Sequence, residues 1–385
     1  MPQELTTFEK RSIKDLNNSQ GFKMKKKKKR VFADLMEKYR GNGCKPECKY
    51  FGECGGCMFQ DIAYENQLLL KKEYVNSVFE GICSVESVAA SNPFSYRNRM
   101  DMVAAFGKKG LRRAGSYRNV VDIEYCSIMQ DRSNDMFAEA RLLLEKIEDY
   151  DYLRHEGYLR YIVLRQARFT GEVMVNFVVS KPENRFGFTL YDFMEKLDSS
   201  SLILSDGLAD LNYGKIFQTL KKGFITETFD GIDYMITPNS FFQSNSEMAL
   251  KMYRKILSFT RGKTLDLYSG VGSISLFAAS AAESVTGVEV IREAVDIAER
   301  NREDNGIENV NFICADAGEY VKENTGNFNT LILDPPRTGM NPKMLKYING
   351  MAAERIIYMS CNPATCRDDL KMMEGYNVDF IEAYD

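Results

Sequence analysis

Tryptophan is absent from this 385-residue sequence, and histidine occurs only once, at His155. Acid–base chemistry would therefore depend on carboxylates, cysteine or lysine. The one histidine stands in "RHEGYLRY", where no other residue has the spacing of a metal ligand, so we interpret it as structural.

Long apolar runs are also lacking. None approaches the ~20 residues of a membrane-spanning helix, and the start "MPQELTTFEKRS" does not have the pattern of a signal peptide. We therefore expect a cytoplasmic protein with no membrane partner. The net charge of −3 argues against a chain that is basic throughout, although 385 residues leave room for two or three domains, one of which could bind nucleic acid.

Basic charge is concentrated in two segments. Residues 21–30, "GFKMKKKKKR", hold seven basic residues and no acid, which favours a solvated tail. Residues 96–118 interleave aromatic side chains with cations, a pattern that suits RNA phosphates and unstacked bases. This second segment has one acidic residue, Asp101. Its basic residues are Arg97, Arg99, Lys108, Lys109, Arg112, Arg113 and Arg118, and its aromatic residues are Tyr96, Phe106 and Tyr117. We predict an RNA-binding surface there, with a solvated face as the alternative.

Four of the nine cysteines lie close together, at Cys44, Cys48, Cys54 and Cys57. In a reducing compartment, such a cluster indicates metal binding rather than disulfides. A zinc site with Cys44 as the fourth ligand is one interpretation. A radical enzyme would require Cys-x3-Cys-x2-Cys, whereas five residues separate Cys48 from Cys54 here.

The residue pattern divides the chain into three parts. Residues 1–43 form a basic leader that we expect to be flexible, with a helix near 30–40 and no N-terminal β-barrel evident. Residues 44–235 hold the cysteines, a predicted helix at 63–82 and two strands around a Thr-Gly turn within 160–180. In residues 236–385, five short apolar runs alternate with helical stretches, which predicts a Rossmann-like, doubly wound α/β domain after a mixed α+β domain.

A glycine loop follows the first of these runs, in "TLDLYSGVGSISLFAASAA". Gly270 and Gly272 allow a tight turn and close approach to a ligand. A nicotinamide dinucleotide fold would have a third glycine where Ser275 stands, which argues against that cofactor. Ligands of such sheets bind at the carboxyl ends of the strands. Four acids are expected at that edge, although each alone could be a helix cap: Asp266, Glu289, Asp316 and Asp334.

The ordered motifs "NSFFQSN", "DLYSGVGSISL", "GVEV", "LDPPRTGM" and "SCNPATCRDDL" resemble the S-adenosylmethionine-dependent RNA 5-methyluridine methyltransferases. "CKYFGECGGC" resembles the iron–sulfur branch that methylates uridine C5 in 23S rRNA, whereas the tRNA branch lacks this cluster. The resemblance implies that Gln243, Tyr268, Glu289 and Asp334 contact the methyl donor, that Gly270, Gly272 and Asp316 line its pocket, and that Phe241 packs where the target base enters. It also implies a [4Fe–4S] cluster on Cys48, Cys54, Cys57 and Cys126.

The resemblance assigns nucleophilic catalysis to Cys361. Because C5 of uracil is a poor nucleophile, a thiolate that adds to C6 makes C5 enolate-like and able to accept a methyl group. Asn362-Pro363 turns the chain directly after a strand, which fixes the sulfur at the sheet edge. The base must first leave its stack. Cys366 matches no family position, and we interpret it as a packing residue.

The family's general base is a glutamate that follows an aspartate corresponding to Asp385, the last residue of this sequence. Glu382 is a poor substitute by position. We therefore expect this chain to methylate RNA but to remain covalently bound to it. The alternatives are a tRNA uridine-C5 methyltransferase and a non-catalytic RNA-binding relative. No obligate protein partner is evident.

Overall fold

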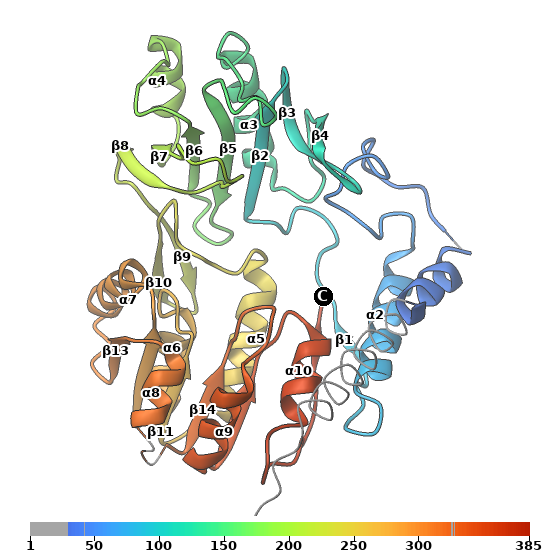
Figure 1. The fold of residues 1–385 in the computed structure, drawn as a ribbon, viewed down its shortest axis with the longest axis vertical. Coiled ribbons are helices and arrows are strands. Elements are labelled where there is room, and N and C mark those ends of the chain that lie inside the picture. Colours follow the sequence, from blue (N-terminus) through green and yellow to red (C-terminus); the bar gives the residue numbers. More distant parts are fainter. Residues whose placement is uncertain (1–29, 42, 325, 327) are drawn as a thin grey trace, which may run out of the picture.

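The structure, a computed structural model, describes residues 30–385 except positions 42, 325 and 327. Two sheets follow one another along the long axis of the molecule, and a helical N-terminal part lies beside them (Figure 1). We call the seven-stranded sheet the central sheet and the five-stranded sheet the parallel sheet. The lysine-rich segment up to residue 29 lies outside the described residues.

The N-terminal part consists of helical residues 30–40 and α2 (Tyr64–Val78), as the sequence predicted. Met36 is buried against Ile62 and Leu70, and Phe32 packs edge-on against Phe59 and Tyr74. Residues 30–40 are therefore packed, and the flexible leader expected from the sequence does not extend to residue 43.

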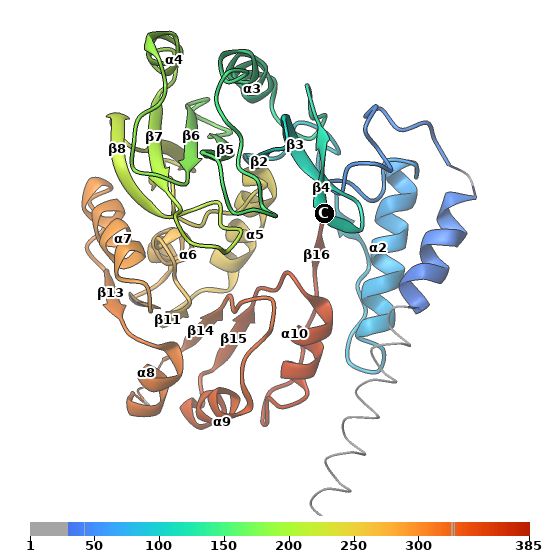
Figure 2. The ribbon, with the colours of Figure 1, turned by 45° about the horizontal axis from the view of Figure 1, so that its top comes forward.

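The last residues of the sequence are bonded to this N-terminal part. Strand β16 (Ala383–Tyr384) pairs in parallel with β1 (Val88–Ala89). The Asp385 carboxylate accepts a hydrogen bond of 2.7 Å from the Tyr64 hydroxyl and forms an ion pair with Lys71. In Figure 2, β16 and the chain end lie next to α2.

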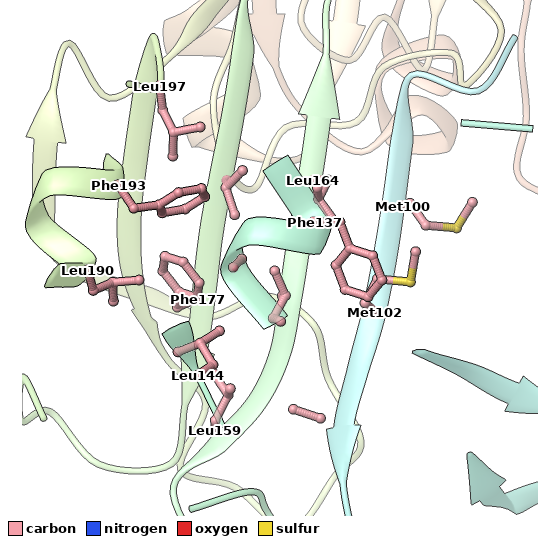
Figure 3. Packing of buried hydrophobic residues seen from close by; sticks show 14 of the residues in the cluster. Met100, Met102, Phe137, Leu144, Leu159, Leu164, Phe177, Leu190, Phe193 and Leu197 are labelled. Atoms are coloured by element: carbon pink, nitrogen blue, oxygen red, sulfur yellow. The ribbon is translucent and has the colours of Figure 1, made fainter. Parts of the chain in front are cut away.

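The central sheet has the strand order β4-β3-β2-β5-β6-β7-β8, in which only the β6–β7 pair is parallel. Its strands are β2 (Arg99–Ala105), β3 (Lys108–Arg113), β4 (Ser116–Asp122), β5 (Leu159–Gln166), β6 (Val173–Val179), β7 (Ser199–Leu204) and β8 (Lys215–Lys221). Every residue of β5 and β6 is buried, because apolar clusters lie on both faces of the sheet. Helices α3 (Asp131–Leu143) and α4 (Phe188–Met194) cover one face with Phe137, Leu190 and Phe193 (Figure 3).

The parallel sheet has the order β13-β12-β11-β14-β15, and all four of its strand pairs are parallel. Its strands are β11 (Lys263–Leu267), β12 (Ser284–Glu289), β13 (Val310–Cys314), β14 (Thr330–Leu333) and β15 (Arg355–Tyr358). Because the order reverses on either side of β11, this is the doubly wound fold that the alternating pattern predicted.

Helices cover both faces of the parallel sheet. They are α5 (Ser246–Phe259), α6 (Ser273–Ala278) with a 3-10 turn η1 (Ala279–Ala281), α7 (Arg292–Asp304), α8 (Ala317–Glu323), α9 (Pro342–Met351) and α10 (Pro363–Leu370). The hairpin of β9 (Ile225–Phe229) and β10 (Ile232–Ile236) buries Phe229 and Tyr234 in the core formed with α5 and α6. The boundary between the two sheet domains therefore precedes β9, whereas the sequence had suggested residue 235. Among the described residues, no helix has the length and apolar character needed to cross a membrane.

Candidate active site

Four residues singled out from the sequence follow neighbouring strands of the parallel sheet. Tyr268 comes directly after β11, Asp334 directly after β14 and Cys361 three residues after β15, while Glu289 ends β12. Because these strands are parallel and paired in register, their carboxyl ends lie at one edge of the sheet. These four residues therefore lie along one edge of the sheet.

The glycine loop after β11 has a backbone that few side chains tolerate. Tyr268 has φ 68°, Gly270 has φ 55° and Gly272 has φ 81°. A Cβ atom on Gly272 would lie 2.6 Å from Cζ of Phe312, so a side chain is excluded there on steric grounds as well. A tyrosine in the left-handed region is strained, and such strain concentrates at ligand-binding loops.

Glu289 and Asp316 are both oriented by backbone amides. The Glu289 carboxylate accepts hydrogen bonds from the amides of Gly270 (3.1 Å), Val290 (2.9 Å) and Ile291 (3.0 Å), which fixes it against the glycine loop. Asp316 caps α8: one of its carboxylate oxygens accepts hydrogen bonds from the amides of Gly318 at 2.9 Å and Glu319 at 3.0 Å. One oxygen of Asp316 is thus a helix cap, the alternative that the sequence had left open.

Two carboxyl groups, those of buried Asp266 and half-buried Asp334, have strongly raised pKa values. Burial raises the pKa of Asp334 to about 7. Burial also raises the pKa of Asp266 to about 7, and the charge of Asp334 adds to this effect. The Ser275 hydroxyl donates to Oδ2 of Asp266 at 2.5 Å, whereas Oδ1 is buried without a hydrogen-bond partner. Ser275, at the position of the third glycine of a dinucleotide loop, thus supplies a hydrogen-bond donor to Asp266.

Cys361 is exposed, in the turn between β15 and α10. The side chain of Asn362 caps α10 by accepting from the Ala364 amide at 3.2 Å, and its Nδ2 donates to the carbonyl oxygen of Arg337 at 3.0 Å. Arg337 belongs to the turn that begins with Asp334. Asn362, the residue after Cys361, is therefore hydrogen-bonded directly to the turn that contains Pro335 and Pro336, the Pro-Pro turn.

A second contact joins the same two loops. Buried Asp369 in α10 accepts a hydrogen bond from the Met340 amide at 2.9 Å and another from the Tyr358 hydroxyl at 2.6 Å. Cys366, one turn earlier, is buried against Val78 and Phe79, and burial raises its pKa to about 12. Cys366 is therefore a packing residue that stays protonated at neutral pH.

Loop 237–246 runs from the end of β10 to the first residue of α5 and carries both aromatic and amide candidates. Phe241 is 70% exposed, whereas Phe242 is buried in the core below it. Gln243 is half-buried, and its side-chain amide has no hydrogen-bond partner among the described residues. An exposed ring and an unengaged amide on one loop are suited to contacts with ligands.

The two acids near the end of the sequence are both engaged. Glu382 forms an ion pair of 3.0 Å with Lys255, and Asp385 is held by Tyr64 and Lys71. These contacts agree with the interpretation of Glu382 as a poor general base.

The four cysteines assigned by resemblance line one pocket: Cys48, Cys54, Cys57 and Cys126. Cys44 is not among its lining residues; it is exposed, and its thiol donates to the Gln60 carbonyl. Amide donors point at two of the pocket sulfurs, from Gly56 to Cys54 and from Gln60 to Cys57, each at 3.3 Å. Burial raises the pKa of Cys126 to about 11. In the described ranges, however, no group of three or more His, Cys, Asp or Glu side chains has the arrangement of a bound metal ion.

The basic segment 96–118 was expected to present its cations to RNA, but the structure pairs several of them with carboxylates. Arg99 pairs with Asp101, Arg112 with Asp210 and Arg113 with Glu53. Lys109 is buried against Asp149. Four of its seven cations are thus paired with carboxylates, so the segment is not a continuous free basic face.

Comparison with known proteins identifies the family. Residues 213–383 match the family described as tRNA (Uracil-5-)-methyltransferase. The chain is 35% identical over 341 residues to the tRNA (uracil(54)-C(5))-methyltransferase of Pyrococcus furiosus, covering 88% of this chain and 81% of the relative. The chain belongs to the S-adenosylmethionine-dependent RNA uracil-5-methyltransferase family. It is therefore an enzyme that uses this donor to methylate C5 of uracil in RNA.

Two further relatives span most of the same length. The crystal structure of the Pyrococcus abyssi tRNA (uracil-54, C5)-methyltransferase with S-adenosyl-L-homocysteine has a TM-score of 0.77 and 34% identity, over 86% of this chain and 82% of the other. An uncharacterised RNA methyltransferase of Clostridium tetani is 33% identical, over 88% of this chain and 80% of the relative. The family predicted from the motifs is confirmed. The relatives whose substrate is named act on tRNA, which favours the alternative over 23S rRNA.

Proposed function

We propose that this uracil-5 methyltransferase modifies tRNA, at the uridine equivalent to position 54. The support is the identity of about one third with enzymes named for that uridine, maintained over 88% of the chain. The rRNA interpretation depended on the cysteine motif alone, on the premise that the tRNA branch lacks this motif. Our proposal combines a tRNA substrate with the cysteine motif and therefore gives up that premise. A local motif is weaker evidence for a substrate than similarity along the whole chain, because the substrate contacts many elements.

The observation that carries the proposed chemistry is the exposed thiol of Cys361, bonded through Asn362 to the turn of Asp334. The Cys361 thiolate forms a bond to C6 of the uracil ring, and the C5–C6 electron pair moves to C5 and O4. The C5 carbanion then takes the methyl group from the sulfonium, which releases S-adenosylhomocysteine. Release of the product then requires a base that takes the C5 proton, which expels the thiolate and restores the ring. We do not assign this role to Glu382, which is paired with Lys255.

For the methyl donor, we propose the residues that the family resemblance assigned. Gln243, Tyr268, Glu289 and Asp334 contact it, while Gly270, Gly272 and Asp316 line the pocket. The carboxylates suit a ligand that carries a sulfonium and an ammonium group. Phe241, with its exposed ring, stacks on or beside the flipped base.

For the cysteine pocket, we propose that Cys48, Cys54, Cys57 and Cys126 hold an iron–sulfur cluster. Four thiols around one zinc ion would lie about 3.8 Å apart, given Zn–S bonds of ~2.3 Å, and the described cysteines do not have the arrangement of a single-ion site. A four-iron cluster needs a wider set of thiolates, and N–H donors aimed at sulfur are typical of its surroundings. Such a cluster would supply mainly a structural cross-link between the Cys48–Cys57 loop and Cys126.

A non-catalytic RNA-binding relative is less well supported. An RNA-binding remnant has no need of an exposed cysteine whose neighbour, Asn362, is hydrogen-bonded to the turn of Asp334, a carboxyl group whose pKa is raised to about 7. Nor does it need a glycine loop in which a Cβ atom would clash with Phe312.

The test is methyl transfer to unmodified RNA transcripts, with labelled S-adenosylmethionine and nucleoside analysis of the product. We expect 5-methyluridine in a tRNA transcript and none when its uridine 54 is replaced by cytidine. Methylation of 23S rRNA in preference to tRNA would restore the first interpretation. No methylation of either RNA, with intact donor binding, would support the non-catalytic alternative.

A further inference from the structure

Residues 95–98 form a short segment with hydrogen bonds on both sides. On one side, the amides of Ser95 and Arg97 donate to the carbonyls of Ser127 (3.0 Å) and Ile128 (2.9 Å). These carbonyls follow Cys126 directly, so this side faces the loop of the cysteine pocket. On the other side, the Asn98 amide donates to the Ser244 carbonyl at 2.9 Å. The segment therefore connects the cysteine pocket to loop 237–246.

The side chain of Asn98 strengthens the second connection. It is 8% exposed, and its Nδ2 donates to the Gln243 carbonyl at 2.7 Å and to the Ser246 hydroxyl at 2.8 Å. Ser246 in turn donates to the carboxylate of Glu227 at 2.6 Å. Glu227 is completely buried, and it also accepts from the amides of Arg168 and Phe169 at 2.8 and 2.9 Å. Asn98 is thus one end of a buried polar network.

The earlier half of loop 237–246 is also held by the central sheet. Nη2 of Arg165, on β5, donates to the carbonyls of Pro238 (3.2 Å) and Ser240 (2.5 Å). Asn239 donates to the Gly214 carbonyl at 3.0 Å, in the segment before β8. The loop that carries Phe241 and Gln243 is therefore attached to the central sheet on both sides of Phe241.

We propose that Asn98 is a positioning residue for Gln243, and that through it the central domain sets the geometry of the methyl-donor and target-base pocket. This inference rests on the proposed roles of Gln243 and Phe241. Because the amide of Gln243 has no partner within the described chain, its direction depends on where its backbone is held. Two of the bonds that hold this backbone, to the carbonyls of Gln243 and Ser244, come from Asn98, about 145 residues earlier in the sequence.

The arrangement also gives the cysteine pocket a defined mechanical role. Any group that fixes Cys126 in place also fixes the carbonyls that pair with Ser95 and Arg97. Residues 95–98 then present Asn98 to loop 237–246 in a constant position. Hydrogen bonds through residues 95–98 thus connect the pocket to the loop of Gln243.

The experiment compares Asn98→Ala with the full-length wild type by hydrogen–deuterium exchange and by calorimetric titration with S-adenosylhomocysteine. Without Asn98, the amides of residues 237–246 should exchange about tenfold faster, because two buried hydrogen bonds to this loop and its flank are lost. The affinity for S-adenosylhomocysteine should fall about tenfold as well. The visible absorption of the iron–sulfur cluster proposed for the cysteine pocket should be unchanged.

Asn309→Ala is the matched control. Asn309 also donates two side-chain hydrogen bonds to carbonyls, those of Ala279 (2.9 Å) and Ala282 (3.1 Å), but neither acceptor belongs to loop 237–246. It should lower the melting temperature while leaving loop exchange and ligand affinity at wild-type values. A folded Asn98→Ala variant with wild-type loop exchange and affinity would overturn the proposal.

A measurement on the wild type keeps the proposal testable if Asn98→Ala does not fold. Binding of S-adenosylhomocysteine should protect the amides of Arg97 and Asn98 together with loop 237–246. Protection of the loop alone would overturn the proposal. Failure of the wild type to bind S-adenosylhomocysteine would contradict the proposed function instead. In that case, the exchange rates of loop 237–246 in the unliganded Asn98→Ala variant would still test the role of Asn98.

Discussion

Nδ2 of Asn362 donates a hydrogen bond of 3.0 Å to the carbonyl oxygen of Arg337. Asn362 follows the exposed thiol of Cys361, and Arg337 lies three residues after Asp334. Because Asp369 also holds the Met340 amide, the nucleophile loop and the Pro-Pro turn are connected at two points. The thiol and the carboxyl group are therefore positioned together, which a reaction between two substrates requires.

Replacement of the exposed cysteine should separate catalysis from stability. Cys361→Ala should lower methyl transfer to RNA by a factor on the order of 10⁴, as expected for loss of a nucleophile, with an unchanged melting temperature. Cys366→Ala should cost about 1 kcal/mol of stability, because it leaves a small cavity against α2, and should retain methyl transfer. The measurements are labelled methyl incorporation and thermal unfolding. Equal activity of the two variants would exclude Cys361 as the nucleophile.

Substitution in the glycine loop should affect donor binding more than folding. Gly272→Ala places a methyl group 2.6 Å from Cζ of Phe312, so the loop must shift. We expect S-adenosylhomocysteine affinity to fall about tenfold or more, equivalent to roughly 1.4 kcal/mol. Gly306→Ala is the control, because Gly306 also has a positive φ (62°) but no atom within 4 Å of the added carbon. A similar loss of affinity in both variants would contradict the steric explanation.

The stability contributed by Asp266 and Asp334 should fall as the pH rises from about 4 to about 7. Asp266 and Asp334 keep their protons up to about pH 7 in the folded protein, whereas an unfolded chain releases them near 3.8. Between these values the folded state binds more protons, so the free energy of unfolding decreases with pH. Asp266→Asn should flatten this dependence, as seen by melting temperatures at pH 5, 6, 7 and 8. An identical pH profile in the variant would contradict the raised pKa.

The affinity for S-adenosylmethionine should increase as the pH rises. S-adenosylmethionine carries a sulfonium charge, which favours the ionised form of nearby carboxyl groups. Binding should therefore release protons near pH 6.5 and become tighter towards pH 8. Calorimetry in two buffers of different ionisation enthalpy measures this release, and S-adenosylhomocysteine, which lacks the sulfonium charge, should release fewer protons. Equal proton release by the two ligands would show that the sulfonium does not act on these acids.

The proposed cluster ligands can be distinguished by two cysteine variants. Purified without oxygen, the wild type and Cys44→Ser should contain iron and absorb visible light, because Cys44 does not line the pocket. Cys126→Ser should lose most of the iron and melt at a lower temperature. A colourless wild type with one zinc, lost in Cys44→Ser, would favour the zinc alternative.

Much of the fold follows from local sequence pattern. The apolar runs that became β11 to β15 are short, separated by helical stretches and rich in β-branched residues, so a parallel, doubly wound sheet could be predicted, although not the order of its strands. The Thr-Gly turn between β5 and β6 was equally clear. Residues Tyr268, Glu289, Asp334 and Cys361 were placed at the sheet edge because parallel strands end together.

What the sequence could not reveal depends on contacts between distant residues. The link from Asn98 to Gln243 spans 145 positions, and no local pattern marks it. The pairing of Arg112 with Asp210 neutralises a cation that looked free in the basic segment. The buried Asp266 did leave a signal, an acid within the apolar run "TLDLY". Its raised pKa, however, arises from burial that only the folded chain provides.

The most direct test of the central claim uses tRNA with 5-fluorouridine at position 54. Fluorine at C5 cannot leave as a cation, so a thiol added to C6 stays attached after methyl transfer. With S-adenosylmethionine present, we predict a covalent complex that survives denaturation and whose cross-linked peptide contains Cys361. No complex, or a cross-link through a different cysteine, would contradict the claim.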